Sequence, residues 1–579
     1  KGGRIRPPFQ MLCRVLVFLL LAAAARAQQT QITVLATTDF YGNLYPIDYV
    51  TDRPAPRGLA QIATLIRAER MRNPNSLLID CGDTIQGTPL EYVYQTLVRT
   101  GAGPLGLKPP ASLSTDPMMA AMSRLGYDAM AVGNHEFNYG LKNLAQARSA
   151  ASFPWISANI AVAPRAKDRP FSPYIVKMVG GIKVAVIGIT TPAVPTWEKP
   201  ENLGGYRFEP PVEAVRRALA ELRAREHPDL TIVAAHSGLG RDLQSGRLED
   251  PSENAVYAIG SAVPELDAIV FGHTHRQLEE AMIGPVLVTQ PKNWGGSLAR
   301  IDFTLERRPD GGWRVVSKHS RLIPVTNDTK AADDILEIAK PYHELAEAYL
   351  NTPVATSPRA LDASLARVED SALVDAIQQV QLYYSKADVS FTAAFNPRVS
   401  APRGQVTVRQ IAALYPYDNE LYVVEGNGKM VKDALENAAR YFLSCEGARC
   451  AEAPLTNRSV FGFNYDMAQG VEYEIDLTKP EGSRICNLRW RGKPLATDQP
   501  LRIAVNNYRA AGSAGYSMFV GAKVVWRSNE EIRDLAVRYY TERKQLPAEP
   551  DGNWRIVPEE ARRTLERQAA EEARRDTLQ

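Results

Sequence analysis

Residues 133–140 read Gly-Asn-His-Glu-Phe-Asn-Tyr-Gly and follow the apolar run 129–132. That run predicts a buried strand that ends in a glycine turn. Residues in such a turn are held by a rigid scaffold, where functional side chains are common. A capped turn explains a single Asn-His pair equally well, so Asn134 and His135 gain meaning only if other strands end in similar residues.

Ligand-type side chains do follow four other predicted strands. The strands are predicted at 31–37, 76–80, 230–235 and 268–271. Predicted helices alternate with them, which indicates α/β layering with polar groups gathered where strands give way to loops. The residues that follow the four strands are Asp39, Asp83, His236, His273 and His275. We expect all five strand ends to converge on one edge of the sheet.

Histidine is concentrated in these turns, because four of the seven histidines of the chain lie there (His135, His236, His273 and His275). Histidines scattered through a core would not be distributed in this way. Together with Asp and Asn they form the ligand set of manganese, zinc or iron ions. The lone carboxylate of Asp83 suits a bridge between two metals about 4 Å apart, a pair that clamps a phosphoryl group and activates water. The sequence therefore predicts two divalent or trivalent metal ions and leaves Mn, Zn and Fe open.

Five short motifs carry a resemblance to a known family. In chain order they are Thr38-Asp39-Phe40-Tyr41-Gly42-Asn43, Asp80-Cys81-Gly82-Asp83, Gly133-Asn134-His135-Glu136, Ala235-His236-Ser237 and Gly272-His273-Thr274-His275. Together they resemble the motifs of the calcineurin-like metallophosphoesterases. Residues 30–557 resemble bacterial 5′-nucleotidases and, more closely, periplasmic 2′,3′-cyclic-nucleotide 2′-phosphodiesterase/3′-nucleotidases. The resemblance implies a four-layer α/β/β/α metallophosphoesterase domain and a second α/β domain, the 5′-nucleotidase C-terminal domain.

The resemblance also implies two metal sites that share one bridging carboxylate. Asp39 and His275 would bind one metal, and Asp83 would bridge to the other. The remaining ligands of the second metal would be Asn134, His236 and His273. The implied class is therefore a metal-dependent phosphoric ester hydrolase.

Two further residues of the central stretch are catalytic candidates, His135 and Asn138. The resemblance implies that His135 stabilises developing charge or protonates the leaving oxygen. Asn138 stands where many 5′-nucleotidases have an aspartate that orients this histidine. An asparagine at this position favours the cyclic-phosphodiesterase branch.

Tyr41 departs from the family pattern, because the first motif normally reads Asp-x-His. Tyr41 could bind a metal through its phenolate, as tyrosine binds ferric iron in the distantly related purple acid phosphatases. It could instead leave a weakened first site that Asp39, Asp83 and His275 still serve. Loss of activity with a retained nucleotide-binding role is the third interpretation. Six of the seven expected ligands are intact, which argues against wholesale loss of the site.

The second domain should recognise base and sugar. Residues 415–419 and 506–516 resemble signatures of that domain, in which two aromatic rings sandwich the nucleobase; by position these are Tyr417 and Tyr516. Base stacking on aromatic rings tolerates any base. Contacts to ribose or phosphate are expected from Arg367, Asn396 and Arg398. Two core tyrosines and plain surface arginines are the alternative interpretation.

The chain is divided as follows. Residues 1–27 have the basic start, short apolar run and Ala-Arg-Ala end of a signal peptide, and the apolar run is too short to span a bilayer. The other predicted segments are a metallophosphoesterase domain at 28–325, a helical linker at 326–351, a substrate-binding domain at 352–557 and a charged tail at 558–579, expected to be a solvated helix. We expect a periplasmic or secreted protein, and export permits a disulfide between Cys445 and Cys450.

Composition and charge exclude other classes of partner. Hydrophobic residues at 45% and charged residues at 23% are ordinary for a globular protein. Loss of the signal peptide removes five basic residues and no acid, so the formal charge falls from +3 to about −2. This balance gives no support for binding a nucleic-acid polymer or a membrane. We expect a monomer that acts on small-molecule nucleotides.

The sequence thus predicts an exported hydrolase of nucleotide catabolism. The favoured activity is that of a 2′,3′-cyclic-nucleotide 2′-phosphodiesterase/3′-nucleotidase. The alternative within the same class is a 5′-nucleotidase or UDP-sugar hydrolase. The alternative from another class is a non-catalytic nucleotide-binding protein with a degenerate first metal site at Tyr41.

Overall fold

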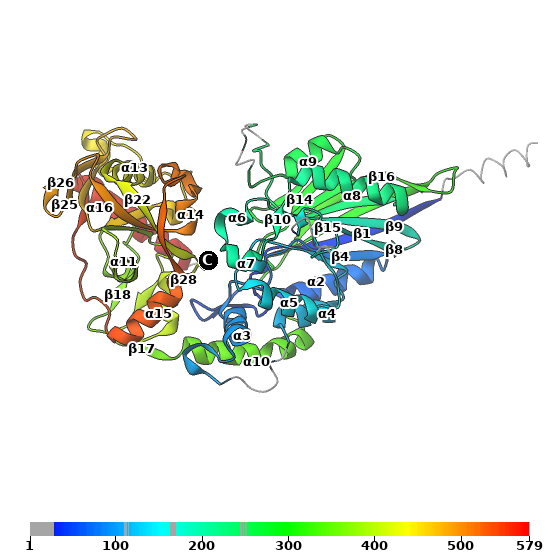
Figure 1. The fold of residues 1–579 in the computed structure, drawn as a ribbon, viewed down its shortest axis with the longest axis horizontal. Coiled ribbons are helices and arrows are strands. Elements are labelled where there is room, and N and C mark those ends of the chain that lie inside the picture. Colours follow the sequence, from blue (N-terminus) through cyan, green and yellow to red (C-terminus); the bar gives the residue numbers. More distant parts are fainter. Residues whose placement is uncertain are drawn as a thin grey trace, which may run out of the picture. The chain divides into compact units, whose positions relative to one another are not determined.

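The computed structural model describes residues 28–577, apart from 109–112, 114, 163–169, 244–245, 247, 249–251 and 418. The predicted signal peptide at 1–27 therefore lies outside the described residues. The chain divides into an N-terminal unit that ends at Pro341 and a C-terminal unit that begins at Tyr342. The short segment Asp48–Arg53 also belongs to the C-terminal unit. Figure 1 shows the elements of each unit.

Two six-stranded sheets form the centre of the N-terminal unit. In the first sheet, the order is β16 (Trp313–Pro324), β15 (Ser297–Arg307), β1 (Gln29–Thr37), β4 (Ser76–Asp80), β5 (Ala129–Ala131) and β6 (Trp155–Ile156). In the second sheet, it is β13 (Leu278–Ile283), β14 (Val286–Gln290), β12 (Ala268–Phe271), β11 (Leu230–His236), β9 (Ile182–Thr190) and β8 (Tyr174–Val179). The central strands β1, β4 and β5 run parallel to one another, and so do β9, β11 and β12.

The two sheets share one hydrophobic core. Val34 of β1 and Ile232 of β11 belong to the same buried cluster. The next residue of β11, Val233, belongs to a second cluster together with residues of α8 (Pro211–Arg225) and α9 (Val256–Ala262). This alternation follows from the two-residue period of a strand, and it shows that both faces of the second sheet are buried.

Helices complete the outer layers of this unit. Figure 1 shows α8 and α9 on one side of the sheets and α2 (Leu59–Arg72), α4 (Pro117–Leu125) and α5 (Gly140–Ala150) on the other. Helix α3 (Pro89–Thr100) precedes α4. The predicted four-layer α/β/β/α architecture is confirmed. The prediction of a single sheet edge is wrong, because the five strand ends come from two sheets.

The C-terminal unit is a separate α/β fold. Its larger sheet has the order β23 (Asp466–Gln469), β19 (Val389–Ala393), β27 (Pro500–Asn506), β22 (Glu420–Asn427) and β28 (Val524–Glu531). The main helices of this unit are α11 (Ala372–Ser385), α12 (Val408–Leu414), α13 (Gly428–Ala439) and α15 (Ile532–Arg543). A smaller sheet has the order β26 (Lys493–Pro494), β25 (Ile485–Trp490), β24 (Glu472–Asp476) and β29 (Trp554–Val557).

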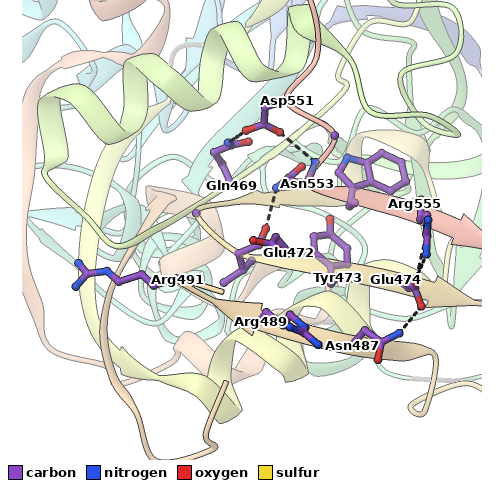
Figure 2. A pocket seen from close by; sticks show the side chains of 14 residues that line it. Gln469, Glu472, Tyr473, Glu474, Asn487, Arg489, Arg491, Asp551, Asn553 and Arg555 are labelled. Carbon is purple, nitrogen blue, oxygen red and sulfur yellow. Dashed lines mark hydrogen bonds and ion pairs between the residues drawn. The ribbon is translucent and has the colours of Figure 1, made fainter. Parts of the chain in front are cut away.

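A cavity of about 750 Å³ lies over the smaller sheet. Figure 2 shows acidic and basic side chains along it, including the ion pair between Glu474 and Arg555. None of the five predicted substrate-binding residues lines this cavity. It therefore contributes nothing to the predicted nucleotide surface.

The connecting and terminal segments are helical. Helix α10 (Asp333–Leu350) lies within the predicted linker. Helix α16 (Glu559–Thr577) covers the predicted charged tail, but Ala561 and Leu565 are buried and the Gln568 side chain donates to Ala453 O at 2.9 Å. The expectation of a solvated helix is therefore wrong, because a narrow apolar stripe packs one face of α16 onto the unit.

Two local features complete the description of the fold. The predicted disulfide between Cys445 and Cys450 is present. In the part of the chain that the structure describes, no helix has the length and apolar character needed to cross a membrane.

Candidate metal centre and active site

The predicted turns meet where the central strands of the two sheets end. Backbone hydrogen bonds connect the turns after β1 and β4, since Asp39 N donates to Gly82 O and Tyr41 N donates to Asp83 O, both at 2.9 Å. The turns after β4 and β5 are joined by a bond from His135 N to Asp83 Oδ1 at 2.9 Å. His273 N, after β12, donates to Asp39 Oδ2 at 3.0 Å and so connects the two sheets.

The backbone of this region is strained. Five of the predicted metal ligands have positive φ values: Asp39 (52°), Tyr41 (50°), Asp83 (59°), His273 (76°) and His275 (55°). Non-glycine residues seldom adopt this conformation, and each case costs of order 1–3 kcal/mol. Such strain is typical of functional sites, where the surrounding structure holds side chains in positions that relaxed turns would not give.

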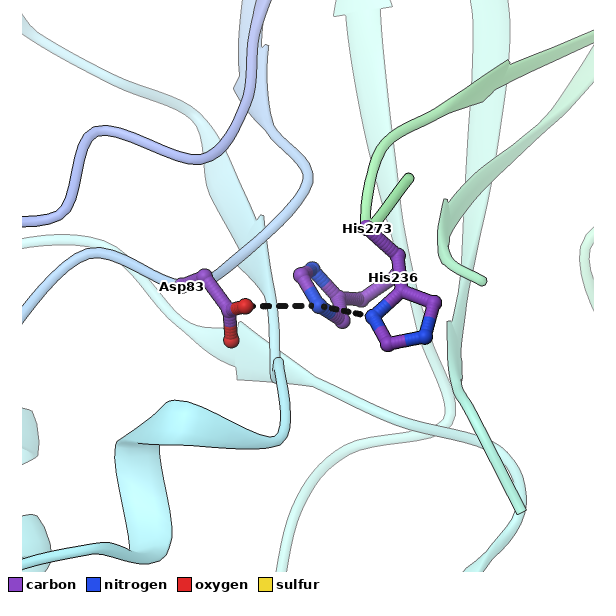
Figure 3. A group of neighbouring side chains, drawn as sticks. All are labelled: Asp83, His236 and His273. Atoms are coloured by element: carbon purple, nitrogen blue, oxygen red, sulfur yellow. Dashed lines mark hydrogen bonds and ion pairs between the residues drawn. The ribbon is translucent and has the colours of Figure 1, made fainter. Parts of the chain in front are cut away.

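Three ligand-type atoms converge on the Nε2 atom of His236. Its Nε2 atom lies 3.0 Å from Asp83 Oδ2, 3.0 Å from Asn134 Oδ1 and 3.3 Å from His273 Nδ1. Figure 3 shows Asp83 and the two imidazole rings facing one another. Asp83 and His236 are fully buried and Asn134 is 5% exposed. Lone pairs so close together repel unless a proton or a cation lies between them, so this set fits a metal ion.

The outward nitrogens of both imidazoles have partners that fix the rings. His236 Nδ1 donates to Cys81 O at 2.8 Å, since a carbonyl oxygen only accepts. His273 Nε2 lies 2.7 Å from the carboxylate of Glu253. Each bond leaves the other ring nitrogen free to face the cluster, as in carboxylate–histidine–metal arrangements.

Glu253 was not found in the sequence because it belongs to no motif. Its backbone carbonyl accepts hydrogen bonds from Thr191 Oγ1 and Ser237 Oγ, both at 2.9 Å. The loop that carries Glu253 is therefore tied to the strand ends.

Electrostatics favour a positive charge in the cluster. Burial opposes the charged form of His236, but the carboxylates of Asp83, Asp39 and Glu136 outweigh burial and raise its pKa to about 10. Burial also works against the charged form of Asp83, yet His236 and His135 hold its pKa below the ordinary value. The site thus attracts a cation even where no metal is present.

Glu136 is a second residue whose role the sequence did not reveal. Its buried carboxylate accepts backbone N–H groups from Gly133 (2.6 Å), Asp83 (3.0 Å) and Thr84 (2.6 Å). These donors belong to the turns after β4 and β5. Glu136 therefore fixes the loops that carry Asp83 and Asn134 relative to each other.

Tyr41 lies in the other half of the centre. Its hydroxyl group donates to Asp83 Oδ2 at 2.8 Å and lies 3.0 Å from His275 Nε2. Asp39 Oδ1 is 3.6 Å from the same nitrogen, and the His275 side chain is 40% exposed. The structure brings Asp39, Tyr41, Asp83 and His275 together, with the phenol oxygen among the predicted ligands of the first metal.

His135 and Asn138 are also adjacent. His135 Nδ1 lies 2.6 Å from Asn138 Oδ1, and His135 Nε2 lies 4.0 Å from Asp83 Oδ2. The amide of Asn138 donates to Glu198 Oε2 at 2.7 Å. Glu198 was not predicted, because it is 60 residues away in sequence and follows the short helix α6 (Val194–Trp197).

The C-terminal unit places the two predicted stacking tyrosines differently. The Tyr417 side chain is 42% exposed, and its ring meets the edge of Phe395 at 5.2 Å. Tyr516 is fully buried, parallel to Phe519, with the Arg509 guanidinium 4.7 Å from its ring centre. Its hydroxyl group donates to Asn464 O at 3.1 Å. The prediction that Tyr516 stacks on a base is wrong in this structure, because the residue belongs to the core.

The predicted ribose or phosphate contacts lie near Tyr417. Arg367 donates to Ala394 O at 2.9 and 3.1 Å, which holds the backbone next to Asn396. Asn396 Oδ1 in turn accepts from Arg398 N at 3.0 Å. Arg367 and Arg398 both line a small cavity of about 90 Å³.

Two exposed aromatic residues beside Arg367 were missed. Phe461 and Phe463 are 63% and 39% exposed, and their rings stack at 5.1 Å with 7° between their planes. Gly462 between them packs directly against the Arg367 guanidinium. The two rings form contiguous exposed apolar surface beside the predicted ribose or phosphate contacts. The signal in the sequence was the Phe-Gly-Phe spacing.

The fold and the site define the class of the protein as metal-dependent phosphoric ester hydrolase, with Asp, Asn and His side chains at the ends of two packed sheets. Residues 32–277 match the family model of the calcineurin-like phosphoesterases, and residues 351–521 match that of the 5′-nucleotidase C-terminal domain. The chain belongs to the calcineurin-like phosphoesterases that carry a 5′-nucleotidase C-terminal domain.

Individual relatives match most of this chain. The trifunctional nucleotide phosphoesterase protein YfkN of Bacillus subtilis is 29% identical over 95% of this chain, which spans 41% of that longer protein. A 2′,3′-cyclic-nucleotide 2′-phosphodiesterase/3′-nucleotidase of Salmonella typhimurium is 29% identical over 94% of this chain and 91% of its own length. A crystal structure described as a 5′-nucleotidase from Staphylococcus aureus has 28% identity and a TM-score of 0.75, and covers 91% of this chain and 100% of its own.

Proposed function

We propose that the chain is a 2′,3′-cyclic-nucleotide 2′-phosphodiesterase/3′-nucleotidase that acts on small-molecule nucleotides. The observation that carries this proposal is the buried cluster of His236 Nε2, Asp83 Oδ2, Asn134 Oδ1 and His273 Nδ1. Asn138 and the name of the Salmonella relative support the cyclic-nucleotide branch. Among the residues that the structure describes, no feature favours nucleic-acid polymers as substrates over nucleotides.

The proposed centre holds two metal ions, Mn, Zn or Fe. His236, His273 and Asn134 would hold one ion, Asp39, His275 and Tyr41 the other, and Asp83 both. The donor set fits, because it consists of imidazole, carboxylate and amide atoms with their lone pairs turned inward. When bound, the metals supply Lewis-acid stabilisation of phosphoryl charge and lower the pKa of water.

The side chains around the centre have separate tasks in this proposal. His135 presents Nε2 towards the side of the cluster where Asp83 lies, so it can donate to the leaving oxygen or to a developing charge. Asn138 orients the ring of His135. The Tyr41 hydroxyl group is close enough to act as a metal ligand once it loses its proton, which its bonds to Asp83 and His275 permit.

On the C-terminal unit, we propose that Tyr417 stacks on the nucleobase, since its ring is accessible. Phe461 and Phe463 extend the exposed aromatic surface on which a base can stack. Arg367, Asn396 and Arg398 would contact ribose or phosphate. Export, a monomeric state and the domain boundaries at 325, 351 and 557 also belong to this proposal.

A metal assay paired with phosphate release tests the function. The expected result is two metals per chain, with turnover of 2′,3′-cAMP and 3′-AMP. Turnover of 5′-AMP alone would replace the main activity with that of a 5′-nucleotidase. Absence of turnover after addition of Mn²⁺, Zn²⁺ or iron, together with nucleotide binding, would leave the non-catalytic binding protein.

A further inference from the structure

A chain of three side chains leads away from the candidate centre. His135 Nδ1 lies 2.6 Å from Asn138 Oδ1, and Asn138 Nδ2 lies 2.7 Å from Glu198 Oε2. Glu198 is 7% exposed, so water does not compete for its carboxylate. We propose that Glu198 is a positioning residue, which fixes the amide of Asn138 and thereby sets which ring nitrogen of His135 carries the proton.

The direction of the chain follows from donor and acceptor chemistry. A carboxylate only accepts hydrogen bonds, so the Nδ2 end of Asn138 must face Glu198. The Oδ1 end then faces His135, and a carbonyl-type oxygen also only accepts. Nδ1 of His135 must therefore carry a proton in both the neutral and the charged ring, and Nε2 is the nitrogen that faces Asp83.

The surroundings of Glu198 keep it an acceptor. Its other oxygen, Oε1, accepts from Lys199 N at 2.7 Å and from Asn202 Nδ2 at 2.8 Å. All three partners of the carboxylate are N–H donors. Burial raises the pKa of Glu198, and these donors oppose that shift by favouring the ionised form.

The same segment is anchored to the active site at two points. Asn202, in α7 (Pro200–Leu203), also donates to Asn138 O at 3.1 Å. Trp197 packs against His273, with 5.7 Å between ring centres. The segment 194–203 is thus held against both the metal cluster and the turn of His135, which makes the position of Glu198 well defined.

Glu198 resolves an ambiguity that an asparagine creates. An amide is neutral, and a half-turn about its terminal bond exchanges its donor and acceptor ends. An aspartate at position 138 would accept from His135 without further help. With asparagine at this position, the negative charge comes from Glu198, which is the next side chain after Asn138 in the hydrogen-bonded chain. This inference rests on the proposed function, in which His135 donates from Nε2 as the ring protonated on both nitrogens, with its Nδ1–H bonded to Asn138 Oδ1.

The decisive variant is Glu198→Gln. Two of the three N–H donors point at Oε1, where an amide NH₂ group would face both of them. The NH₂ group of the new glutamine is therefore expected at the position of Oε2, facing Asn138. Asn138 must then reverse, and its NH₂ end meets His135 Nδ1. We expect the proton of the neutral ring to move to Nε2. Glu201→Gln is the matched control, because it removes the same charge from an exposed position in the same segment.

Nitrogen NMR of ¹⁵N-histidine-labelled, zinc-loaded protein reads the tautomer directly, with His135→Gln identifying the signals of the ring. The wild-type protein and Glu201→Gln are expected to carry the proton on Nδ1, and Glu198→Gln on Nε2. A wild-type ring protonated at Nε2 alone would overturn the proposal, whether or not any variant folds. This measurement stands even if no nucleotide is turned over.

Kinetics provide the second test. We expect kcat of Glu198→Gln to fall about 10- to 100-fold, with KM and metal content unchanged. An amide NH₂ group that faces Nδ1 disfavours the ring protonated on both nitrogens, which is the form that donates from Nε2. Loss of such an acid costs about 10²- to 10⁴-fold, and the reversal is partial. Adding Asn138→Asp to this variant should recover kcat at least about tenfold, since the carboxylate then accepts directly from His135. Unchanged kcat in Glu198→Gln, or no recovery in the double variant, would contradict the proposal.

Discussion

The two halves of the metal centre differ in how completely the protein prepares them. On the His236 side, Asp83, His236 and Asn134 are buried, and both imidazoles have outward partners in Cys81 O and Glu253. On the Tyr41 side, His275 is 40% exposed and a phenol stands where the family has a histidine. A ligand side chain whose other polar atom already has a hydrogen-bond partner loses less conformational freedom when it binds a metal. We therefore expect one tight site and one weak site.

The largest effect should come from removing the centre of the tight half. We expect His236→Ala to lower kcat by about 10³-fold or more, because several kcal/mol of charge stabilisation are lost. Metal analysis should show that this variant loses the tightly held ion. The matched variant His275→Ala in the weak half should lose less activity. Equal losses of activity in the two variants would contradict the proposed difference between the two halves of the centre.

A smaller effect is expected from Glu253→Gln. The carboxylate that holds His273 would be replaced by an amide, which weakens the orientation of Nδ1 towards the cluster. Loss of such a partner lowers metal affinity by about 10- to 100-fold. Competition with a chelator measures this affinity. Glu265→Gln serves as the control, because that residue pairs with Arg223 at the surface. Identical affinities in the two variants would exclude a role for Glu253.

Tyr41→His should strengthen metal binding in the weak half of the centre. A neutral imidazole binds divalent ions without first losing a proton, which a phenol with a pKa near 10 must do. We expect the affinity for the second metal ion to rise about tenfold, measured by calorimetry with Zn²⁺. Tyr41→Phe is the control that removes the oxygen altogether. A fall in affinity in Tyr41→His would instead mark Tyr41 as a good ligand.

Some parts of this centre were predictable because their signals are local. Each proposed ligand lies within a few residues of the end of a strand, so hydrophobic runs and the following polar residue were enough to find Asp39, Asp83, Asn134 and His236. The pairing of those strands was not predictable from their pattern. A buried strand has the same kind of sequence in either of two packed sheets, so the strand pattern suggested a single sheet edge, and only the family resemblance implied two sheets.

The residues that support the ligands could not be predicted from the sequence for a different reason. Glu136, Glu198 and Glu253 reach their partners through the folded structure, and a glutamate in a loop carries no local mark of this role. Tyr516 shows the converse error. It lies in a recognisable motif, yet its ring is buried by Phe519 and Arg509, and burial depends on packing that no motif encodes.

The most direct test is a metal titration of the metal-free protein, followed by dialysis against a graded series of chelator concentrations. The account predicts two ions per chain that leave in two separate steps, the first lost at a low chelator concentration. Tyr41→His should bring the two steps together, and Glu253→Gln should shift only the second. A single ion per chain, or two ions released together from the wild-type protein, would contradict a centre with one prepared half and one weak half.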